Sequence, residues 1–256
     1  MFKDRKTLHI TGNGPELRVE LNSPETGNAI SEEILDDLLA VLEEVHDRPE
    51  IRVVVLSGAG PDFCLGGDRR EFTGQLADDP TASRLRTIGG KARRVCDALA
   101  TTTAVTIARL HGQVMGAGLA LALFCDLRIG ASDSRFRLPE LALGIPAAWG
   151  GSLPRLLHEA GAARIRELIL TGNSFDAARA EQLSVLHRVV PEIELDDAID
   201  EWSRPVIRRS AAALRATKTL LNSYSAASRL GDTTLLDAEL LTAVVAAGRE
   251  KSERRR

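Results

Sequence analysis

The chain of 256 residues lacks several features that mark particular classes of protein. It has only three cysteines, Cys64, Cys96 and Cys125, an odd number with no CxxC pair. A disulfide framework or a cysteine-based metal site is therefore not expected, and the five histidines show no metal-ligand spacing either. No apolar run approaches the ~20 residues that a membrane-spanning helix needs. We expect reduced core cysteines, no metal and no membrane partner.

Excess charge of one sign is also missing. The net charge is −3 and the isoelectric point is about 6.0, so no general attraction to nucleic acid is expected. The basic end, Arg254 to Arg256, is interpreted as a solvated terminus. The first residues, Met1 to Lys6, have no apolar segment of the secretory type. The chain is predicted to be cytoplasmic, with no nucleic-acid partner.

Apolar residues (44%) and charged residues (27%) occur in ordinary proportions, which indicates a globular chain with a sizeable core. Residues 17–21 alternate in polarity and predict a strand with one solvent-facing side. Ser31 begins a helical pattern that closes near Pro49. Residues 52–56 form a β-branched run typical of a buried strand. Strand, helix and buried strand in succession predict an α/β fold.

The same order of elements repeats further along the chain. The pattern predicts a loop over 73–83, a helix over 84–100, a strand over 104–110, a helix over 116–124 and a strand over 127–129. A strand, a glycine turn and a helix thus occur twice, at 56–68 and at 110–124.

Beyond Pro191 the pattern becomes helical alone. Amphipathic segments are predicted over 195–209 and 211–229, and a Leu, Ala and Val-rich segment over 232–248. The last segment has apolar residues on more than one face, which indicates burial against another element or subunit. We expect an α/β core over 1–200 and a helical oligomerisation segment over 201–256.

Two glycine turns and one carboxylate are the candidate chemical groups. Gly116-Ala117-Gly118 opens an apolar helix, and Leu65-Gly66-Gly67-Asp68 follows the buried strand. The first N–H groups of a helix lack intrahelical partners and favour negative charge. Gly67 and Ala117 are therefore candidate donors to an enolate oxygen, with Glu140 as the proton carrier. Glycine turns also serve a purely structural role, and this alternative stays open.

A series of short motifs carries a resemblance to a known family. In order, they are Pro24 to Ile30, Val53 to Gly60, Phe63 to Asp68, Gly112, Gly116 to Gly118, Cys125-Asp126, Phe136 to Glu140, and Leu170 to Gly172. Together they resemble the crotonase superfamily, the enoyl-CoA hydratase and isomerase relatives. The resemblance extends from about Leu17 to Pro191, with a looser helical end.

The resemblance implies a crotonase-like spiral of ββα turns with a C-terminal helical segment for trimerisation. It implies a homotrimer or a dimer of trimers that takes acyl-CoA or acyl-carrier-protein thioesters. Coenzyme A would be part of the substrate, and no separate cofactor is expected. In this comparison Gly67 and Ala117 match the two amide donors. Glu140 matches the second of the two glutamates found in the hydratases.

Further positions are implied to contact the substrate. Leu65 and Asp68 match backbone-lined contacts to coenzyme A, and Arg70 occupies a position that is often basic. Gly116 is expected to contact the substrate or coenzyme A, and Trp149, which departs from the family pattern, is expected to contact the substrate by narrowing the acyl pocket. Structural alternatives remain for each: Asp68 as a cap, Arg70 as a solvated charge and Trp149 as a core residue. For Glu140 the alternative is a surface carboxylate after Pro139.

The main departure from the family is Ala120, where hydratases usually carry a glutamate. A methyl group cannot activate water, whereas one carboxylate suits a shuttle of a proton between two carbons. Glu25 also stands where relatives often place a lysine. A double-bond isomerase is therefore the favoured prediction. The alternatives are a single-glutamate hydratase, dehydratase or lyase, and a non-catalytic thioester-binding scaffold.

Overall fold

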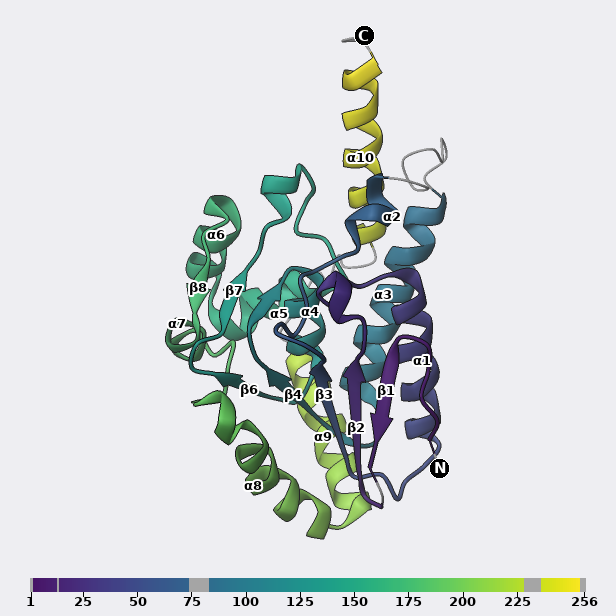
Figure 1. Ribbon diagram of the computed structural model, residues 1–256, viewed down its shortest axis with the longest axis vertical. Helices are drawn as coiled ribbons and strands as arrows, with labels where there is room; N and C mark the ends of the chain where they lie inside the picture. The colour runs from purple at the N-terminus through teal and green to yellow at the C-terminus, as the bar shows by residue number, and fades with distance from the viewer. Residues whose placement is uncertain (1, 13, 74–82, 228–235, 254–256) are drawn as a thin grey trace.

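The computed structural model describes residues 2–12, 14–73, 83–227 and 236–253, and its centre is a six-stranded sheet (Figure 1). The strand order is β1-β2-β3-β4-β6-β9. These strands are β1 (Leu8–Thr11), β2 (Glu16–Leu21), β3 (Val53–Gly58), β4 (Val105–Leu110), β6 (Leu127–Ala131) and β9 (Arg188–Val190). The β1–β2 pair is antiparallel and every other pair is parallel. The α/β class predicted from the sequence is confirmed.

A second, smaller layer lies beside this sheet. It consists of β5 (Gln113–Met115), β7 (Arg135–Arg137) and β8 (Phe175–Asp176). Two isolated parallel bridges, Ile30 to Gly67 and Cys64 to Val114, extend it to earlier parts of the chain. A strand of the large sheet is thus followed by an extended segment of the second layer and then by a helix. This is the expected spiral of ββα turns.

Helices follow the second-layer segments. They are α1 (Glu32–His46), α2 (Arg69–Thr73), α3 (Ser83–Thr101), α4 (Ala117–Phe124), α5 (Ser152–Ala160), α6 (Ala162–Thr171) and α7 (Ala177–Gln182). The predicted start of α1 is confirmed, because the Ile34 N–H donates to Ser31 Oγ at 3.2 Å. Short 3-10 helices cover Pro24–Thr26, Glu140–Leu143 and Glu192–Glu194.

The alternation of side chains along β3 explains its continuous apolar sequence. Val54 and Leu56 join the main core with α1, α3 and α4. Val53 and Val55 face the other way, into a second cluster with Ile107 and Ile129. A strand that is covered on both faces needs apolar residues at every position.

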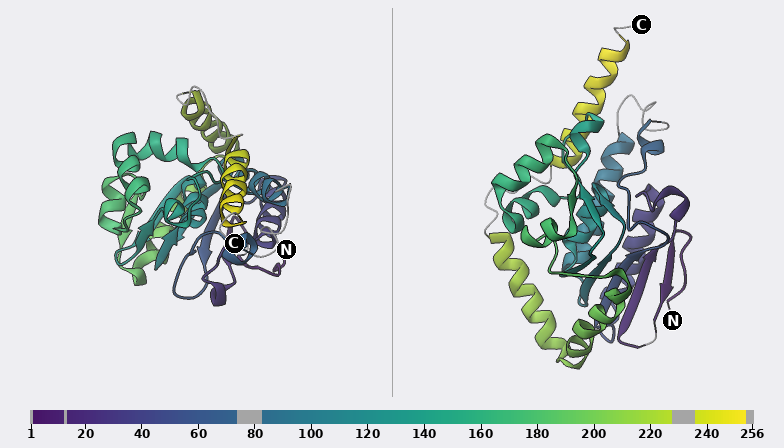
Figure 2. Two further views of the ribbon diagram at one scale, coloured as in Figure 1. Left: turned by 90° about the horizontal axis from the view of Figure 1, so that it is seen from above. Right: turned by 60° about the vertical axis from the view of Figure 1, so that its left-hand side comes forward.

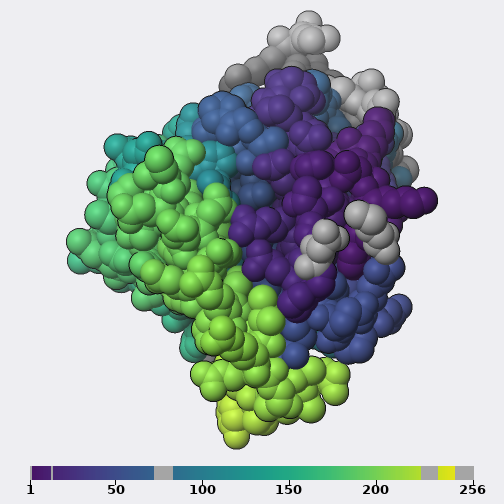
Figure 3. Space-filling view, turned by 60° about the horizontal axis from the view of Figure 1, so that its bottom comes forward, coloured from purple at the N-terminus to yellow at the C-terminus, as the bar shows by residue number. Residues whose placement is uncertain are grey.

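Helix α8 (Leu195–Arg208) covers that second face of the sheet through Leu195, Ala198 and Ile199. In Figure 3 the light-green segment lies against the purple N-terminal strands, where Arg18 pairs with Asp196 at 2.7 Å. The predicted boundary at residue 200 falls inside this helix. The division into a core over 1–200 and a segment over 201–256 stays a prediction.

Two further helices complete the chain, as predicted. Helix α9 (Ala211–Ala227) is held by buried Lys218, whose Nζ lies 2.7 Å from Asp126 Oδ2. Helix α10 (Asp237–Glu253) packs against α3 and projects from the body with the C-terminus (Figures 1 and 2). Residues 74–82 of the predicted loop and the tail at 254–256 lie outside the described residues. No helix of the described part is long and apolar enough to cross a membrane.

Candidate active site

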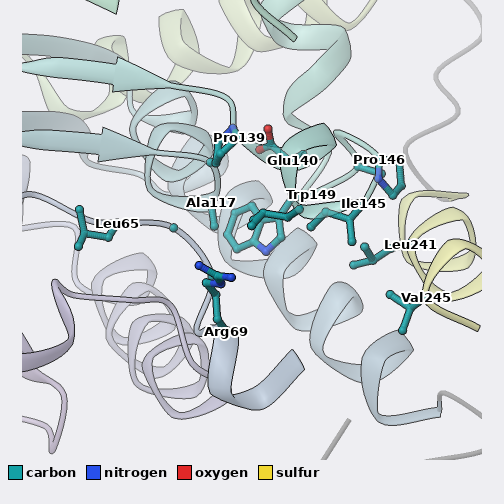
Figure 4. A pocket seen from close by; sticks show the side chains of 15 residues that line it. Leu65, Arg69, Ala117, Pro139, Glu140, Ile145, Pro146, Trp149, Leu241 and Val245 are labelled. Carbon is teal, nitrogen blue, oxygen red and sulfur yellow. The ribbon is translucent and has the colours of Figure 1, made fainter. Parts of the chain in front are cut away.

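A cavity with a volume of about 270 Å³ lies between the two glycine turns, the segment after β7 and helix α10 (Figure 4). Six of the predicted site residues line it: Leu65, Gly67, Gly116, Ala117, Glu140 and Trp149. The structure therefore brings both candidate amides and the candidate acid–base residue into one cavity.

Parallel pairing in the second layer explains this convergence. Cys64 pairs with Val114, and Met115 pairs with Arg137. Gly67, Ala117 and Glu140 follow shortly after these paired positions, at the same end of neighbouring parallel segments. The carboxyl ends of parallel strands are where α/β folds commonly bind ligands.

The two candidate donors are available to a ligand. Within the described ranges, neither the Gly67 N–H nor the Ala117 N–H donates a hydrogen bond. Ala117 is the first residue of α4, where the helix macrodipole favours a negative charge. Gly66 and Gly116 precede the two donors with φ values of +103° and +44°. Only glycine adopts such turns readily, so these residues shape the backbone of the site.

The Glu140 side chain is largely withdrawn from water. Its Oε2 atom is buried and has no hydrogen-bond partner among the described residues. Burial raises the pKa of Glu140 above the ordinary value of 4.5, because the ionised form loses solvation. The structural alternative of a surface carboxylate after Pro139 is therefore wrong. A carboxyl group whose pKa is raised is a stronger base once it is ionised, and it can both accept and return a proton.

The rest of the lining is mostly apolar. Ile145, Pro146 and Ala148 come from the loop after the Glu140–Leu143 turn, and Leu241 and Val245 come from α10. Trp149 is half-buried: it packs against the core and also lines the cavity. The core interpretation of Trp149 is compatible with its place at the cavity, and its contact with an acyl group stays a prediction. None of the α10 residues was predicted, although the apolar character of that segment indicated burial.

Asp68 and Arg70 do not line this cavity. The Arg70 Nη2 atom lies 2.6 Å from Asp68 Oδ2, and this contact holds the pKa of Asp68 below its ordinary value. Both side chains belong to a neighbouring polar depression that also contains Glu25. Their expected contact with coenzyme A stays a prediction. Arg69, which was not singled out, lines the cavity instead.

Ala120 lies on α4, one turn beyond Ala117, and is only 3% exposed. Positions separated by three residues are neighbours on a helix surface. A methyl group therefore stands one turn from the Ala117 amide, where a glutamate would bring a second carboxylate. Among the described residues that line the cavity, Glu140 is the only carboxylate.

Other reactive groups do not add to the site. Burial raises the pKa of the Cys64 thiol to about 12, so this cysteine is not a nucleophile near neutral pH. All three cysteines are buried and unpaired, as expected. Within the part of the chain that the structure describes, no three His, Cys, Asp or Glu side chains are placed to hold a metal ion.

Comparisons with known proteins agree with this geometry. The family model for enoyl-CoA hydratase/isomerase matches residues 16–254. A probable enoyl-CoA hydratase, echA8 of Mycobacterium tuberculosis, is 33% identical over 205 residues, which are 80% of this chain and 76% of the relative. The chain belongs to the enoyl-CoA hydratase/isomerase family, within the crotonase superfamily.

Solved structures match over almost the whole chain. Pseudomonas aeruginosa AtuE superposes with a TM-score of 0.80 at 32% identity, over 97% of this chain and 91% of that chain. A putative enoyl-CoA hydratase from Thermobifida fusca in complex with CoA has a TM-score of 0.78 at 29% identity, covering 98% and 95%. The fold predicted from the sequence motifs is therefore confirmed.

Proposed function

We propose that this protein is a double-bond isomerase of unsaturated acyl thioesters. The observation that carries the proposal is the single carboxylate, Glu140, in a cavity that also presents the unpaired amides of Gly67 and Ala117. Two carboxylates suit the addition of water, since one orients the water and the other delivers a proton. One carboxylate suits the transfer of a proton between two carbons of the substrate.

The reaction needs no group beyond these residues. The Glu140 carboxylate removes a proton from C2 of a 3-enoyl thioester, and the electron pair moves into a dienolate. The negative charge collects on the thioester oxygen, which accepts hydrogen bonds from Gly67 and Ala117. Each such donor contributes about 3 kcal/mol to transition-state stabilisation. Glu140 then returns the proton to C4, which gives the 2-enoyl thioester and restores the carboxylate.

The carrier of the acyl group is proposed to be coenzyme A. The solved relative from Thermobifida fusca contains CoA, and Arg69 at the cavity offers a positive charge for an anionic carrier. An acyl-carrier-protein thioester is the alternative. A direct comparison of kcat/KM for one acyl group on the two carriers distinguishes them.

A single-glutamate hydratase, dehydratase or lyase is the second candidate, because the matched relative is named a probable enoyl-CoA hydratase. The test supplies a set of 2-enoyl-CoA and 3-enoyl-CoA substrates to the unaltered protein. Isomerisation without net hydration supports the proposal. Hydration of a short 2-enoyl-CoA at rates on the order of 10² s⁻¹ would contradict it.

Ala120→Glu sharpens this test, because it restores a carboxylate next to the oxyanion turn. We expect hydratase turnover to rise above that of the unaltered protein. Ala122→Ser, on the same helix and equally buried, is the control for introducing a polar group into α4. If Glu140→Gln still binds the thioesters and the unaltered protein has no activity to lose, the non-catalytic scaffold is supported instead.

A homotrimer or a dimer of trimers is part of the proposal. Helices α9 and α10 expose large apolar side chains, namely Leu220, Leu221 and Tyr224 on α9 and Leu240 and Val244 on α10. Such a concentration on two helices supports contact with further copies of this chain. Light scattering coupled to size-exclusion chromatography tests the assembly, and a monomeric mass would contradict it.

A further inference from the structure

The cavity has two distinct ends. In Figure 4, Leu65 and Ala117 lie at one end, Trp149 lies in the middle, and Leu241 and Val245 of α10 lie at the other. The amides that would hold the thioester oxygen are at the first end. An acyl chain that starts there extends past Trp149 toward α10.

The end near α10 is lined by side chains without polar groups. Leu241 is only 4% exposed, and Val245 is half-buried. Ile145 and Pro146 complete this part of the lining. Such a surface accepts methylene groups and offers no partner to a charged or hydroxylated tail.

Helix α10 is fixed against the rest of the molecule close to this wall. A Cβ placed on Gly89 would lie 2.9 Å from Ala238 Cβ, so α3 and α10 are in close contact. The Gly151 N–H donates to Asp237 Oδ2 at 3.0 Å. Gly150 and Gly151 adopt left-handed conformations, with φ values of +60° and +79°. Asp237 therefore ties the first turn of α10 to the loop that carries Trp149.

We propose that Leu241 and Val245 form the end wall of the acyl site and set the maximum length of an apolar acyl chain, with Asp237 as the positioning residue that holds α10 there. The inference deepens the proposed function and rests on its assignment of the thioester end. It names the substrate class as apolar acyl thioesters of limited length.

The test uses the full chain and a series of saturated acyl-CoA probes of four to twelve carbons, whose binding needs no turnover. Affinity is expected to rise with chain length until the tail reaches the wall, and then to stop rising. Leu241→Ala moves this break to longer chains, and Val245→Trp moves it to shorter ones. Between the two breaks, Val245→Trp binds each chain more weakly than the unaltered protein does, by about fourfold for every methylene that is no longer buried.

Glu239→Gln is the control, because Glu239 is a neighbour on α10 whose side chain is 55% exposed and does not line the cavity. Its break stays at the length of the unaltered protein. If the affinity stops rising at the same acyl length in all four proteins, or if a variant changes the affinity equally at every acyl length, Leu241 and Val245 do not form the end wall. Val245→Trp replaces a half-buried residue, so it keeps the test valid if Leu241→Ala unfolds.

Asp237 is tested separately. Asp237→Ala removes the acceptor for the Gly151 N–H. The affinity is then expected to level off gradually with acyl length, without a sharp limit. Asp237→Asn keeps an acceptor oxygen and is expected to keep the sharp limit of the unaltered protein. An Ala variant with the unaltered profile would overturn the role of Asp237. The proposed reaction is judged independently by isomerisation of the 3-enoyl-CoA series. If the variants shift the limiting acyl length but the unaltered protein does not isomerise 3-enoyl-CoA, the proposed reaction is wrong and the proposed end wall still holds.

Discussion

The Glu140 Oε1 atom lies 3.3 Å from the point where a Cβ on Gly116 would stand. A side chain at position 116 would therefore press on the Glu140 carboxyl group, which would have to shift by a few tenths of an ångström. In the proposed reaction, the missing side chain at Gly116 leaves room for this carboxyl group beside the turn that presents the Ala117 amide.

Gly116→Ala is therefore expected to reduce kcat by about a hundredfold, because small misplacements of a catalytic group have effects of this size. The φ of +44° adds backbone strain of about 1–3 kcal/mol. The measurement is steady-state isomerisation together with thermal unfolding. Gly144→Ala is the matched control, since Gly144 has a φ of +74° and nothing within 4 Å of its Cβ position. It should lose stability and keep kcat; an equal loss of kcat in both variants would refute the steric argument.

Ala117→Pro removes one proposed oxyanion donor. Proline is tolerated at the first position of a helix, where its missing N–H breaks no intrahelical bond. We expect kcat to fall by about 10² to 10³, with the helical content measured by circular dichroism retained. Ala117→Ser keeps the N–H and should retain most of the activity. Full activity of the proline variant would show that this amide does not hold the oxyanion.

The raised pKa of Glu140 has a consequence for stability. Below the unfolded pKa the carboxyl group is protonated in both states and carries no penalty. As the pH rises through the folded pKa, the buried group must ionise, and the folded state loses stability relative to the unfolded state. Glu140→Gln abolishes this ionisation. Its gain in unfolding free energy, measured by urea denaturation, should be larger at pH 8 than at pH 4. Glu167→Gln, an exposed exchange, serves as the control; equal gains at both pH values would contradict the burial argument.

The same shift predicts the pH dependence of catalysis. The first proton transfer needs ionised Glu140, so kcat/KM should rise with pH along a limb whose apparent pKa lies above 4.5. The profile is measured with a 3-enoyl-CoA substrate between pH 4 and pH 9. An apparent pKa at or below 4.5 for this limb would show that an exposed carboxyl group controls the rate, or that no carboxyl group does.

Much of this architecture could be predicted from local patterns. Ser31 before a helical apolar stripe indicated the start of α1, and the run at 52–56 indicated a strand that is covered on both faces. Glu140 could not be recognised in this way, because a glutamate after a proline resembles a surface residue. Its predicted role rests on the order of the family motifs. Its burial depends on the pairing of β7 with β5, which brings together segments that are distant in the sequence.

Other parts of the site depend on packing between distant segments. Arg69 and Arg70 are adjacent in sequence, yet Arg70 turns to Asp68 while Arg69 lines the cavity. The direction of α2 decides between them, and no local pattern encodes it. Leu241 and Val245 reach the cavity because α10 packs on α3, more than a hundred residues earlier. The apolar faces of α10 predicted that this segment is buried, but they did not identify the element against which it packs.

In the proposed reaction, one carboxylate transfers a proton between two carbons of a thioester that two amides hold. The most direct measurement is proton NMR of a 3-enoyl-CoA incubated with the protein in deuterated water. Conversion to the 2-enoyl-CoA by the unaltered protein, and none in Glu140→Gln, is the predicted result. Hydrogen that was on C2 is then found on C4, and deuterium enters C4 only in turnovers in which the protonated carboxyl group exchanges with the solvent before it returns the proton. A hydrated product in place of the 2-enoyl-CoA, or conversion that persists in Glu140→Gln, would contradict the account.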